Sequence, residues 1–148
     1  MEYKLTKSKD RDINRLIEYK KEIIFEFAKD LKDEEIIEIN NYANKEVKKL
    51  IKDYCNIVVD NKIVGCLLLT NKNDGKLLDE IYLEKEYRNK GIGTNIIKKI
   101  IKDNDIIYLW VYKDNIKAIS LYKKLSFNVI LETESRYYMK YSRSMRNR

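Results

Sequence analysis

Hydrophobic side chains in the first third of the chain recur with the spacing of helices. After a short predicted strand in YKLTKS, apolar residues return every three or four positions from Asp10 to Lys29, which predicts a helix with one buried face. A second helix is predicted from Asp33 to about Lys52, because the acidic run DEEI suits the positive end of a helix dipole. The first third therefore predicts one strand followed by two helices.

The pattern changes to strands in the middle of the chain. NIVVD and KIVGCLLLT are apolar runs joined at Asp60 and Asn61, and this spacing favours a β-hairpin. The stretch NKNDG then supplies an Asp-Gly turn into a third strand, KLLDEIYLE. Three antiparallel strands are therefore predicted before residue 86.

Helices and strands alternate in the last third. TNIIKKIIKD places four isoleucines on one face of a helix, and DIIYLWVY has the continuous apolar character of a buried strand. NIKAISLYKKL predicts a further amphipathic helix, and FNVILETE and RYYMKYS predict a closing hairpin. The predicted order is β-α-α-β-β-β-α-β-α-β-β, an α/β fold without an internal repeat.

The length and composition limit the class of protein. A chain of 148 residues predicts a single domain, residues 1–148. No apolar run approaches the ~18 residues of a membrane span, and MEYKLTKSKD lacks the apolar core of a signal peptide, so a cytoplasmic protein without a membrane partner is expected. The formal net charge of +7 favours an anionic partner. The basic end of the chain, YSRSMRNR, is expected to be solvated, without a catalytic role.

The chain contains no histidine, which excludes Ser-His-Asp and Cys-His catalysis. Proton transfer must therefore use Asp, Glu, Tyr, Lys or Cys. The two cysteines, Cys55 and Cys66, are expected to face each other across the predicted hairpin as reduced thiols, because disulfides are rare in the cytosol. No metal is expected, because two thiols are too few soft ligands for zinc.

Two of the chain's four glycines, Gly91 and Gly93, flank a single residue between a predicted strand and a predicted helix. Backbone N–H groups of such a turn converge on an anion at the positive end of the helix, and Arg88, Lys90 and Thr94 add charge and a hydroxyl. A plain tight turn is the alternative. The sequence of the loop excludes a P-loop, which needs Lys-Ser or Lys-Thr after the second glycine. It also excludes the dinucleotide-binding fingerprint, because an isoleucine stands at the position of the third glycine.

RNKGIG, residues 88–93, resembles the R/Q-x-x-G-x-G/A loop of the GNAT superfamily of acetyl-CoA-dependent N-acetyltransferases, which wraps the coenzyme A pyrophosphate. NIKAISLYKKLSF is similar to the superfamily's second motif, N-x-x-A-x-x-x-Y-x-x-x-G-F, at Asn115, Ala118, Tyr122 and Phe127. Ser126 replaces the usual glycine, and a serine at a positive φ has a modest energetic cost. The resemblance covers most of the chain from Asn56 on. It implies the acyl-CoA N-acyltransferase (GNAT) fold, with a central mixed, mostly antiparallel sheet flanked by helices.

A narrower similarity concerns LLDEIYLEKEYRNKGIGTNIIKKI, which resembles the corresponding stretch of spermidine/spermine-type acetyltransferases. Their two adjacent acids are matched here by Asp79 and Glu80, whereas Lys85 and Asn89 replace a proline and a glycine. The resemblance implies a carboxylate that accepts the proton of the amine, directly or through water, with Asp79 preferred and Glu80 or an ordered water as alternatives. In a regular strand the two acids point to opposite faces unless a bulge intervenes. The non-catalytic alternative is a solvated pair at a strand edge, or partners for nearby lysines.

Tyr122 is implied by the same resemblance to donate a proton to the departing thiolate, because tyrosine stays protonated at neutral pH; core packing is its alternative role. Asn115 is expected to cap a helix and contact coenzyme A. The backbone of Ile81 and Leu83 is expected to pair with the pantetheine arm like an added strand. The complete set implied to bind the cofactor is Ile81, Tyr82, Leu83, Arg88, Asn89, Lys90, Gly91, Ile92, Gly93, Thr94, Asn115, Ala118 and Tyr122.

The resemblance therefore implies acetyl transfer from acetyl-CoA to a primary amine, with a small cationic amine or polyamine as the favoured acceptor. The alternatives are a protein or peptide N-acetyltransferase, a non-catalytic acyl-CoA-binding module and a nucleic-acid-binding module that uses the basic surface. A homodimer stays open. The first two helices, where this superfamily builds its acceptor pocket, carry no motif that identifies the amine.

Overall fold

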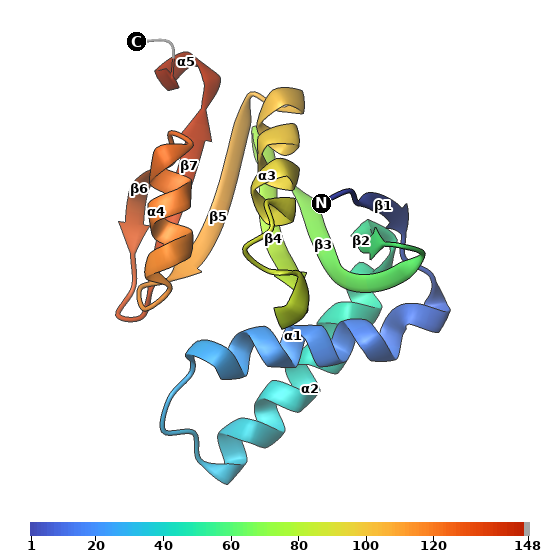
Figure 1. Cartoon of the computed structure of the whole chain (residues 1–148). Coiled ribbons are helices and arrows are strands. Elements are labelled where there is room, and N and C mark those ends of the chain that lie inside the picture. Colours follow the sequence, from blue (N-terminus) through green and yellow to red (C-terminus); the bar gives the residue numbers. More distant parts are fainter. Residues whose placement is uncertain (147–148) are drawn as a thin grey trace. The chain divides into compact units, whose positions relative to one another are not determined.

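The computed structural model describes residues 1–146 (Figure 1). Its main elements follow the predicted order, and a short terminal helix, α5 (Arg143–Arg146), is added. The chain divides into two compact units. We call residues 2–68 and 80–85 the N-terminal unit, and residues 69–79 with those from 86 onward the C-terminal unit. A single domain over residues 1–148 stays a prediction.

Seven strands pair in the order β1-β2-β3-β4-β5-β7-β6. The long strands β3 (Lys62–Lys72) and β4 (Gly75–Leu83) contribute residues to both units. Strands β4 and β5 are parallel, and the β1–β2, β2–β3, β5–β7 and β6–β7 pairs are antiparallel. The mixed, mostly antiparallel sheet is thereby confirmed. The remaining strands are β1 (Lys4–Lys7), β2 (Tyr54–Val59), β5 (Ile106–Tyr112), β6 (Asn128–Glu132) and β7 (Arg136–Ser142).

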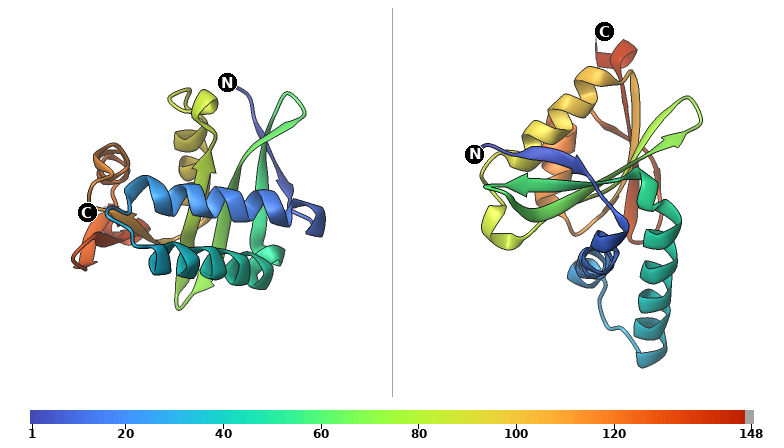
Figure 2. Two further views of the ribbon diagram at one scale, coloured as in Figure 1. Left: turned by 90° about the horizontal axis from the view of Figure 1, so that it is seen from below. Right: turned by 90° about the vertical axis from the view of Figure 1, so that its right-hand side faces the viewer.

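In the N-terminal unit, helices α1 (Ile13–Phe27) and α2 (Asp33–Leu50) pack side by side (Figure 2). They are shorter than the predicted helices because single 3-10 turns, Asp10–Asp12 and Ile51–Asp53, replace their outer ends. Apolar side chains from both helices and from the strands form one core, which stabilises this unit by removing them from water. Its buried members are Leu16, Ile17, Tyr19, Ala43, Val47, Tyr54, Cys66, Leu68 and Tyr82.

The β2–β3 hairpin turns at Asp60 and Asn61, as predicted, and both residues have positive φ angles, 50° and 65°. A β-bulge beyond the turn shifts the register by one residue, so that Cys55 lies opposite Leu67 and not opposite Cys66. The expectation that the two cysteines face each other was therefore wrong. Both thiols are free; Cys66 is buried and Cys55 is half-buried.

The turn between β3 and β4 also differs from its prediction. Asn73 and Asp74 form the turn, with Asn73 at a φ of 47°, and Gly75 already belongs to β4. Gly75 is needed for a different reason, because a Cβ there would collide with the carbonyl oxygen and side chain of Ile106. Gly75 therefore permits the close approach of the backbones of β4 and β5, and it does not form the turn.

The C-terminal unit contains helices α3 (Ile92–Asp103) and α4 (Ile116–Lys124). Helix α3 connects the parallel strands β4 and β5, and β7 pairs with β5 on its other side. Isoleucines three and four positions apart form the buried face of α3, as the sequence predicts. These buried residues are Ile92, Ile96, Ile97, Ile100 and Ile101.

The basic end of the chain is only partly as expected. Tyr141 and Ser142 complete β7, and the guanidinium of Arg143 donates hydrogen bonds to the carbonyl oxygens of Ile101 and Lys102. Arg143 is therefore not simply solvated. Asn147 and Arg148 lie outside the described residues. Within the described chain, every helix is too short or too polar to cross a membrane; a cytoplasmic location stays a prediction.

Candidate active site

The predicted anion loop follows β4 and leads into α3. Gly91 caps α3 in the left-handed conformation, with a φ of 87°. Nothing lies within 4 Å of the position that a Cβ would take at Gly91. The glycine is therefore required by its backbone conformation, and the space beside it is open to a ligand.

The first turn of α3 presents free backbone donors. The carbonyl of Gly91 accepts the N–H of Asn95 at 3.0 Å, which starts the helix. The N–H groups of Ile92, Gly93 and Thr94 precede the first intrahelical donor, so they have no acceptor within the helix. Together with the helix dipole, these groups favour an anion such as a pyrophosphate.

A lysine of α4 adds positive charge to this loop. Lys117 Nζ donates a hydrogen bond to Asn89 Oδ1 at 2.7 Å, and Asn89 adopts a φ of 60°. Asparagine tolerates this left-handed conformation, which explains how it can replace the glycine of the related motif. Arg88 and Lys90 belong to the same loop. The contact of Lys117 was not predicted, because a lysine on an exposed helix face carries no distinguishing signal.

The second predicted motif forms a capped helix. The side chain of Asn115 accepts the N–H of Ala118 at 3.2 Å and caps α4, as predicted. At the other end, Ser126 has a φ of 75°. The N–H groups of Ser126 and Phe127 donate to the carbonyls of Lys123 and Tyr122, which is the Schellman arrangement. The usual glycine of the motif is thus explained by the left-handed residue that ends α4.

Tyr122 is the buried aromatic residue of this motif. Its ring contacts that of Phe127 with a centroid distance of 5.6 Å, so the predicted packing role is real. Burial raises the pKa of Tyr122 to about 12. Its hydroxyl makes no hydrogen bond to another residue of the described chain. The tyrosine therefore holds its proton at neutral pH and has a free donor, which suits a general acid.

The two adjacent acids of β4 have opposite environments. Asp79 is exposed and Glu80 is buried, in the alternating burial pattern of a regular strand. Glu80 Oε1 accepts from Lys20 Nζ and from the Tyr54 hydroxyl, each at 2.9 Å, and Oε2 accepts from Cys66 Sγ at 3.0 Å. Both oxygens of Glu80 are therefore occupied, which disfavours Glu80 as the base. The catalytic roles of both acids stay predictions.

This buried cluster, Lys20, Tyr54, Cys66 and Glu80, belongs to the N-terminal unit. Burial, reinforced by the Glu80 carboxylate, raises the pKa of the Cys66 thiol well above its usual range. Cys66 is therefore a neutral thiol that donates a hydrogen bond, not a nucleophile. No sequence signal pointed to this cluster, because its members are far apart along the chain.

The end of β4 supplies the backbone predicted to pair with pantetheine. Ile81 and Leu83 are half-buried, whereas Tyr82 points into the core and contacts the ring of Tyr19 at a centroid distance of 4.7 Å. A Cβ at Gly65 would collide with the Tyr82 carbonyl, so β3 and β4 approach closely here. The side chain of Tyr82 therefore has a packing role.

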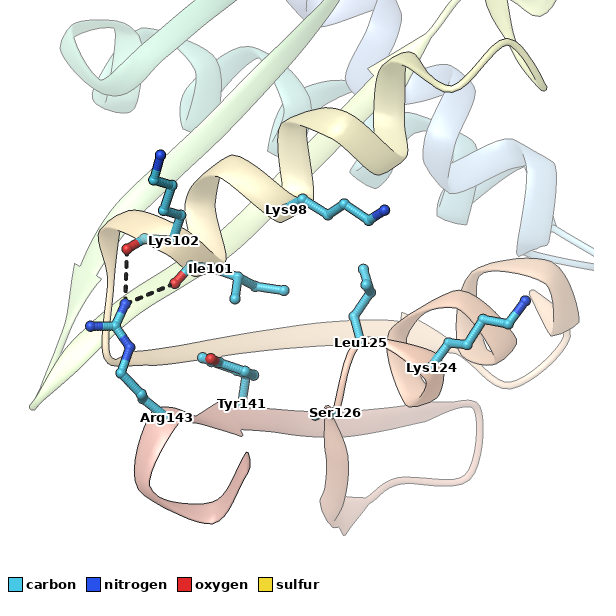
Figure 3. A pocket seen from close by; sticks show the side chains of 8 residues that line it. All are labelled: Lys98, Ile101, Lys102, Lys124, Leu125, Ser126, Tyr141 and Arg143. Atoms are coloured by element: carbon cyan, nitrogen blue, oxygen red, sulfur yellow. Dashed lines mark hydrogen bonds between the residues drawn. The ribbon is translucent and has the colours of Figure 1, made fainter. Parts of the chain in front are cut away.

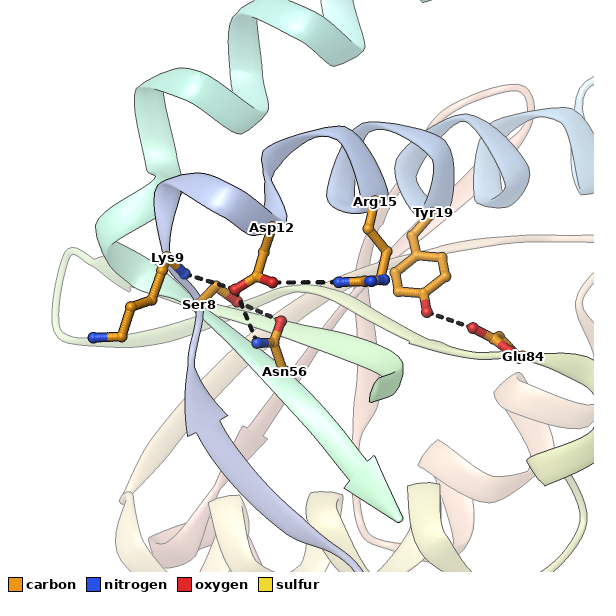
Figure 4. Close-up of polar contacts among 7 residues, drawn as sticks. All are labelled: Ser8, Lys9, Asp12, Arg15, Tyr19, Asn56 and Glu84. Carbon is orange, nitrogen blue, oxygen red and sulfur yellow. Dashed lines mark hydrogen bonds and ion pairs between the residues drawn. The ribbon is translucent and has the colours of Figure 1, made fainter. Parts of the chain in front are cut away.

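Hydrogen bonds of two side chains, Tyr19 and Asp12, hold α1 and the turn before it in the N-terminal unit (Figure 4). The Tyr19 hydroxyl donates to Glu84 at 2.5 Å. At the start of the helix, Asp12 accepts from the backbone of Lys9 and from the amide of Asn56. Burial raises the pKa of Asp12, but these hydrogen bonds and the nearby arginines outweigh it and lower the pKa overall. We assign these contacts a structural role.

The fold and the paired motifs define an α/β protein with a glycine loop that suits an anion at the start of α3. Comparison with known proteins gives the family. The profile described as "Acetyltransferase (GNAT) family" matches residues 16–127. The chain therefore belongs to the acetyltransferase (GNAT) family, which confirms the predicted family and fold.

Two curated relatives and one solved structure are similar to this chain. A probable spermine N(1)-acetyltransferase of Bacillus subtilis subsp. natto is 35% identical over 63 residues, covering 38% of this chain and 41% of the relative. A thialysine N-epsilon-acetyltransferase of Sus scrofa is 40% identical over 62 residues, covering 38% of this chain and 36% of the relative. The chain thus spans about two fifths of the length of these relatives.

The fold resembles the PaiA N-acetyltransferase of Thermoplasma acidophilum, solved in complex with coenzyme A. The TM-score is 0.78 at 24% identity, covering 96% of this chain and 99% of that one. This likeness concerns the fold. Among residues 1–146, no group of three His, Cys, Asp or Glu side chains could hold a metal ion.

Proposed function

We propose that this protein transfers the acetyl group of acetyl-CoA to a primary amine, with a small cationic amine or polyamine as acceptor. The observation that carries the proposal is the combination of two motifs within the C-terminal unit: the open, left-handed Gly91 loop at the start of α3, and the Asn115 to Phe127 segment with buried Tyr122. Family membership supports acetyl-CoA as the cosubstrate.

The loop binds the pyrophosphate of the cosubstrate in this proposal. The free N–H groups of Ile92, Gly93 and Thr94 donate to phosphate oxygens, and Arg88, Lys90 and Lys117 neutralise charge. The backbone groups of Ile81 and Leu83 pair with the amides of the pantetheine arm.

Asp79 and Tyr122 move the two protons of the reaction. The acceptor arrives as an ammonium ion with a pKa near ~10.4, so less than ~0.1% is nucleophilic at neutral pH without a base. Asp79 accepts the ammonium proton, and the amine nitrogen attacks the thioester carbonyl. The C–S bond then breaks, and Tyr122 donates its proton to the departing thiolate. The second proton lost by the amine nitrogen restores the Tyr122 hydroxyl, so the products are the acetylated amine, free coenzyme A and the proton held by Asp79.

The proposed acceptor class rests on charge and on relatives. Asp79 is an exposed carboxylate in a protein of net charge +7, and it provides a local site for a cation. The relatives are named for spermine and thialysine, both cationic amines. A peptide acceptor is the competing outcome.

An acceptor screen tests the proposal. Release of free thiol from acetyl-CoA is measured with spermidine, spermine, diamines, a lysine analogue, aromatic amines and peptides. We expect the cationic small amines to give the highest kcat/KM. A preference for peptide N-termini would assign the peptide alternative, and acetyl-CoA binding without turnover on any amine would assign the non-catalytic one.

A further inference from the structure

Strands β5 and β7 of the C-terminal unit carry a row of aromatic side chains on the face that points away from α3 and α4. Figure 3 shows Tyr141 of β7 on the other face, where it lines a pocket with residues of α3 and α4. Side chains alternate along a strand, so Tyr138 points away from these helices. The ring of Tyr138 lies 5.6 Å from that of Tyr108 and 4.5 Å from that of Trp110, centroid to centroid. Trp110 and Tyr138 are half-buried, so this aromatic surface is partly open.

Asp79, the proposed base, belongs to the same face of the sheet. Leu78 of β4 pairs with Leu109 of β5, and both leucines are buried. Continuing this parallel register by one residue places Asp79 next to Trp110 on the adjacent strand, on the face opposite the two leucines. Asp79 is exposed there. The carboxylate of Asp79 therefore borders the aromatic surface at Trp110.

A cation lies on the aromatic surface beside this position. Arg136 Cζ lies 4.7 Å from the centroid of the Trp110 ring, which is a cation–π contact. The turn before β7 holds the backbone of Arg136, whose N–H donates to Thr133 Oγ1 at 3.0 Å and whose carbonyl accepts the N–H of Thr133 at 2.9 Å. Within residues 1–146, the guanidinium forms no ion pair with a carboxylate. An arginine on an aromatic ring keeps its planar N–H donors for such a group.

The other charges of this face do not compensate Arg136. Asp74 accepts a hydrogen bond from the Tyr108 hydroxyl at 2.7 Å, at the far end of the aromatic surface. Lys140 Nζ lies 5.4 Å from the Tyr108 ring centroid, so a second cation accompanies that carboxylate. An acceptor bound at Asp79 extends toward Arg136 along the aromatic surface. A second ammonium group on the acceptor would be repelled there, whereas a carboxylate would be attracted.

We propose that the acceptor amine also carries a carboxylate, which Arg136 binds while Asp79 receives the amine. The inference rests on the proposed function, because it takes Asp79 as the base, and it narrows the acceptors to basic and ω-amino acids. The guanidinium lies over β5 and its backbone belongs to β7, so it stands one to two strand spacings, ~5–10 Å, from β4. A carbon chain of about four to eight bonds covers this span. Lysine and 6-aminohexanoate have chains of this length.

A matched pair of acceptors isolates the contribution of the carboxylate. 6-Aminohexanoate and 6-aminohexanamide have the same amine and the same chain, and only the first carries a negative charge. Wild type should have a kcat/KM at least about tenfold higher for the acid, through a lower KM, because the acid gains a charge-assisted contact. Lysine should likewise exceed 1,5-diaminopentane, which lacks only the carboxylate. Isothermal titration in the presence of coenzyme A, which has no acetyl group to transfer, should give the same order of affinities.

Variants of β7 locate the contact. Arg136→Gln should lower kcat/KM for 6-aminohexanoate at least about tenfold and change that for 6-aminohexanamide less than about twofold, so that the preference disappears. Arg136→Lys keeps the charge and should keep part of the preference. Lys140→Gln removes one charge from the same face of β7 but over Tyr108, and it should change the preference less than about twofold.

Two results would overturn the inference: equal rates and affinities for the two acceptors in wild type, or a parallel loss for both in Arg136→Gln, as expected of a purely structural arginine. If diamines and the amide are acetylated as well as the acid, the proposed function stands and this inference fails. If no amine is acetylated, the proposed function fails and the titration decides the inference. A preference for the acid that Arg136→Gln removes would then support it, and equal affinities would reject it.

Discussion

Two residues with opposite surroundings are proposed to move the two protons of the reaction. Asp79→Asn keeps the shape of the exposed side chain but cannot accept a proton, so kcat/KM should fall by about 10²- to 10⁴-fold near neutral pH. Raising the pH should recover part of the loss, because more amine then arrives deprotonated. The measurement is kcat/KM against pH with the best amine. A normal rate for Asp79→Asn at neutral pH would exclude Asp79 as the base.

Tyr122→Phe should behave differently. The pKa of Tyr122 is raised to about 12, so the wild-type tyrosine stays protonated below that pH and contributes no alkaline decline to the profile. Its loss should reduce the rate less than the loss of Asp79, because a thiolate with a pKa near ~8.5 is a tolerable leaving group. Alkaline pH should not restore the rate. A recovery parallel to that of Asp79→Asn would contradict the assignment of the acid.

A further prediction from a single residue concerns Ser126 and the stability of the fold. A serine at a φ of 75° is strained, whereas glycine adopts this conformation freely. Ser126→Gly should raise the free energy of unfolding by about 1 kcal/mol, and the Tm by ~2–4 °C for a domain of this size. Ser135→Gly, outside any helix or strand, is the control. A loss of stability in Ser126→Gly would show that the serine side chain compensates for the strain.

Helix α1 and strand β4 are linked by the buried pair Lys20 and Glu80, 2.9 Å apart. Removing one partner leaves an uncompensated buried charge, so Lys20→Met should cost about 3–5 kcal/mol in urea unfolding. The adjacent Lys21, paired with Glu18 at the surface, supplies the matched control, and Lys21→Met should cost less than about 1 kcal/mol. Equal costs would mean that the buried pair contributes little.

The elements were more predictable than the contacts between them. Isoleucine spacing predicted α3, and the motif position of Ser126 predicted its positive φ, because each depends only on the local sequence. The β2–β3 bulge was not predictable, since one extra residue in a strand changes no pattern of apolar residues yet moves Cys55 opposite Leu67. The contacts of Glu80 and of Lys117 depend on residues distant in the sequence. Side-chain pairing of that kind has no local signature.

Binding of acetyl-CoA at the proposed site should change the thermal stability of the whole molecule. The pyrophosphate loop, α3 and α4 belong to the C-terminal unit, while β3 and β4 contribute residues to both units. If the chain is one domain, as we propose, acetyl-CoA should raise the Tm of a single cooperative transition. At an acetyl-CoA concentration of a hundred times Kd, binding adds ~2.7 kcal/mol to the free energy of unfolding, which corresponds to a rise in Tm of roughly 5–10 °C. Two transitions, of which acetyl-CoA moves one, would show that the units unfold separately.

Gly91 variants separate ligand binding from folding in this experiment. Gly91→Asn suits the left-handed φ of 87° but fills the open space beside the loop, so it should unfold near the wild-type Tm and lose the acetyl-CoA shift. Gly91→Val is strained at that φ, because its side chain is branched, and should lose stability as well as the shift. Differential scanning calorimetry with and without acetyl-CoA measures both quantities. A full shift in Gly91→Asn would place the pyrophosphate elsewhere, because the open space beside Gly91 would then not be the space that the cosubstrate fills.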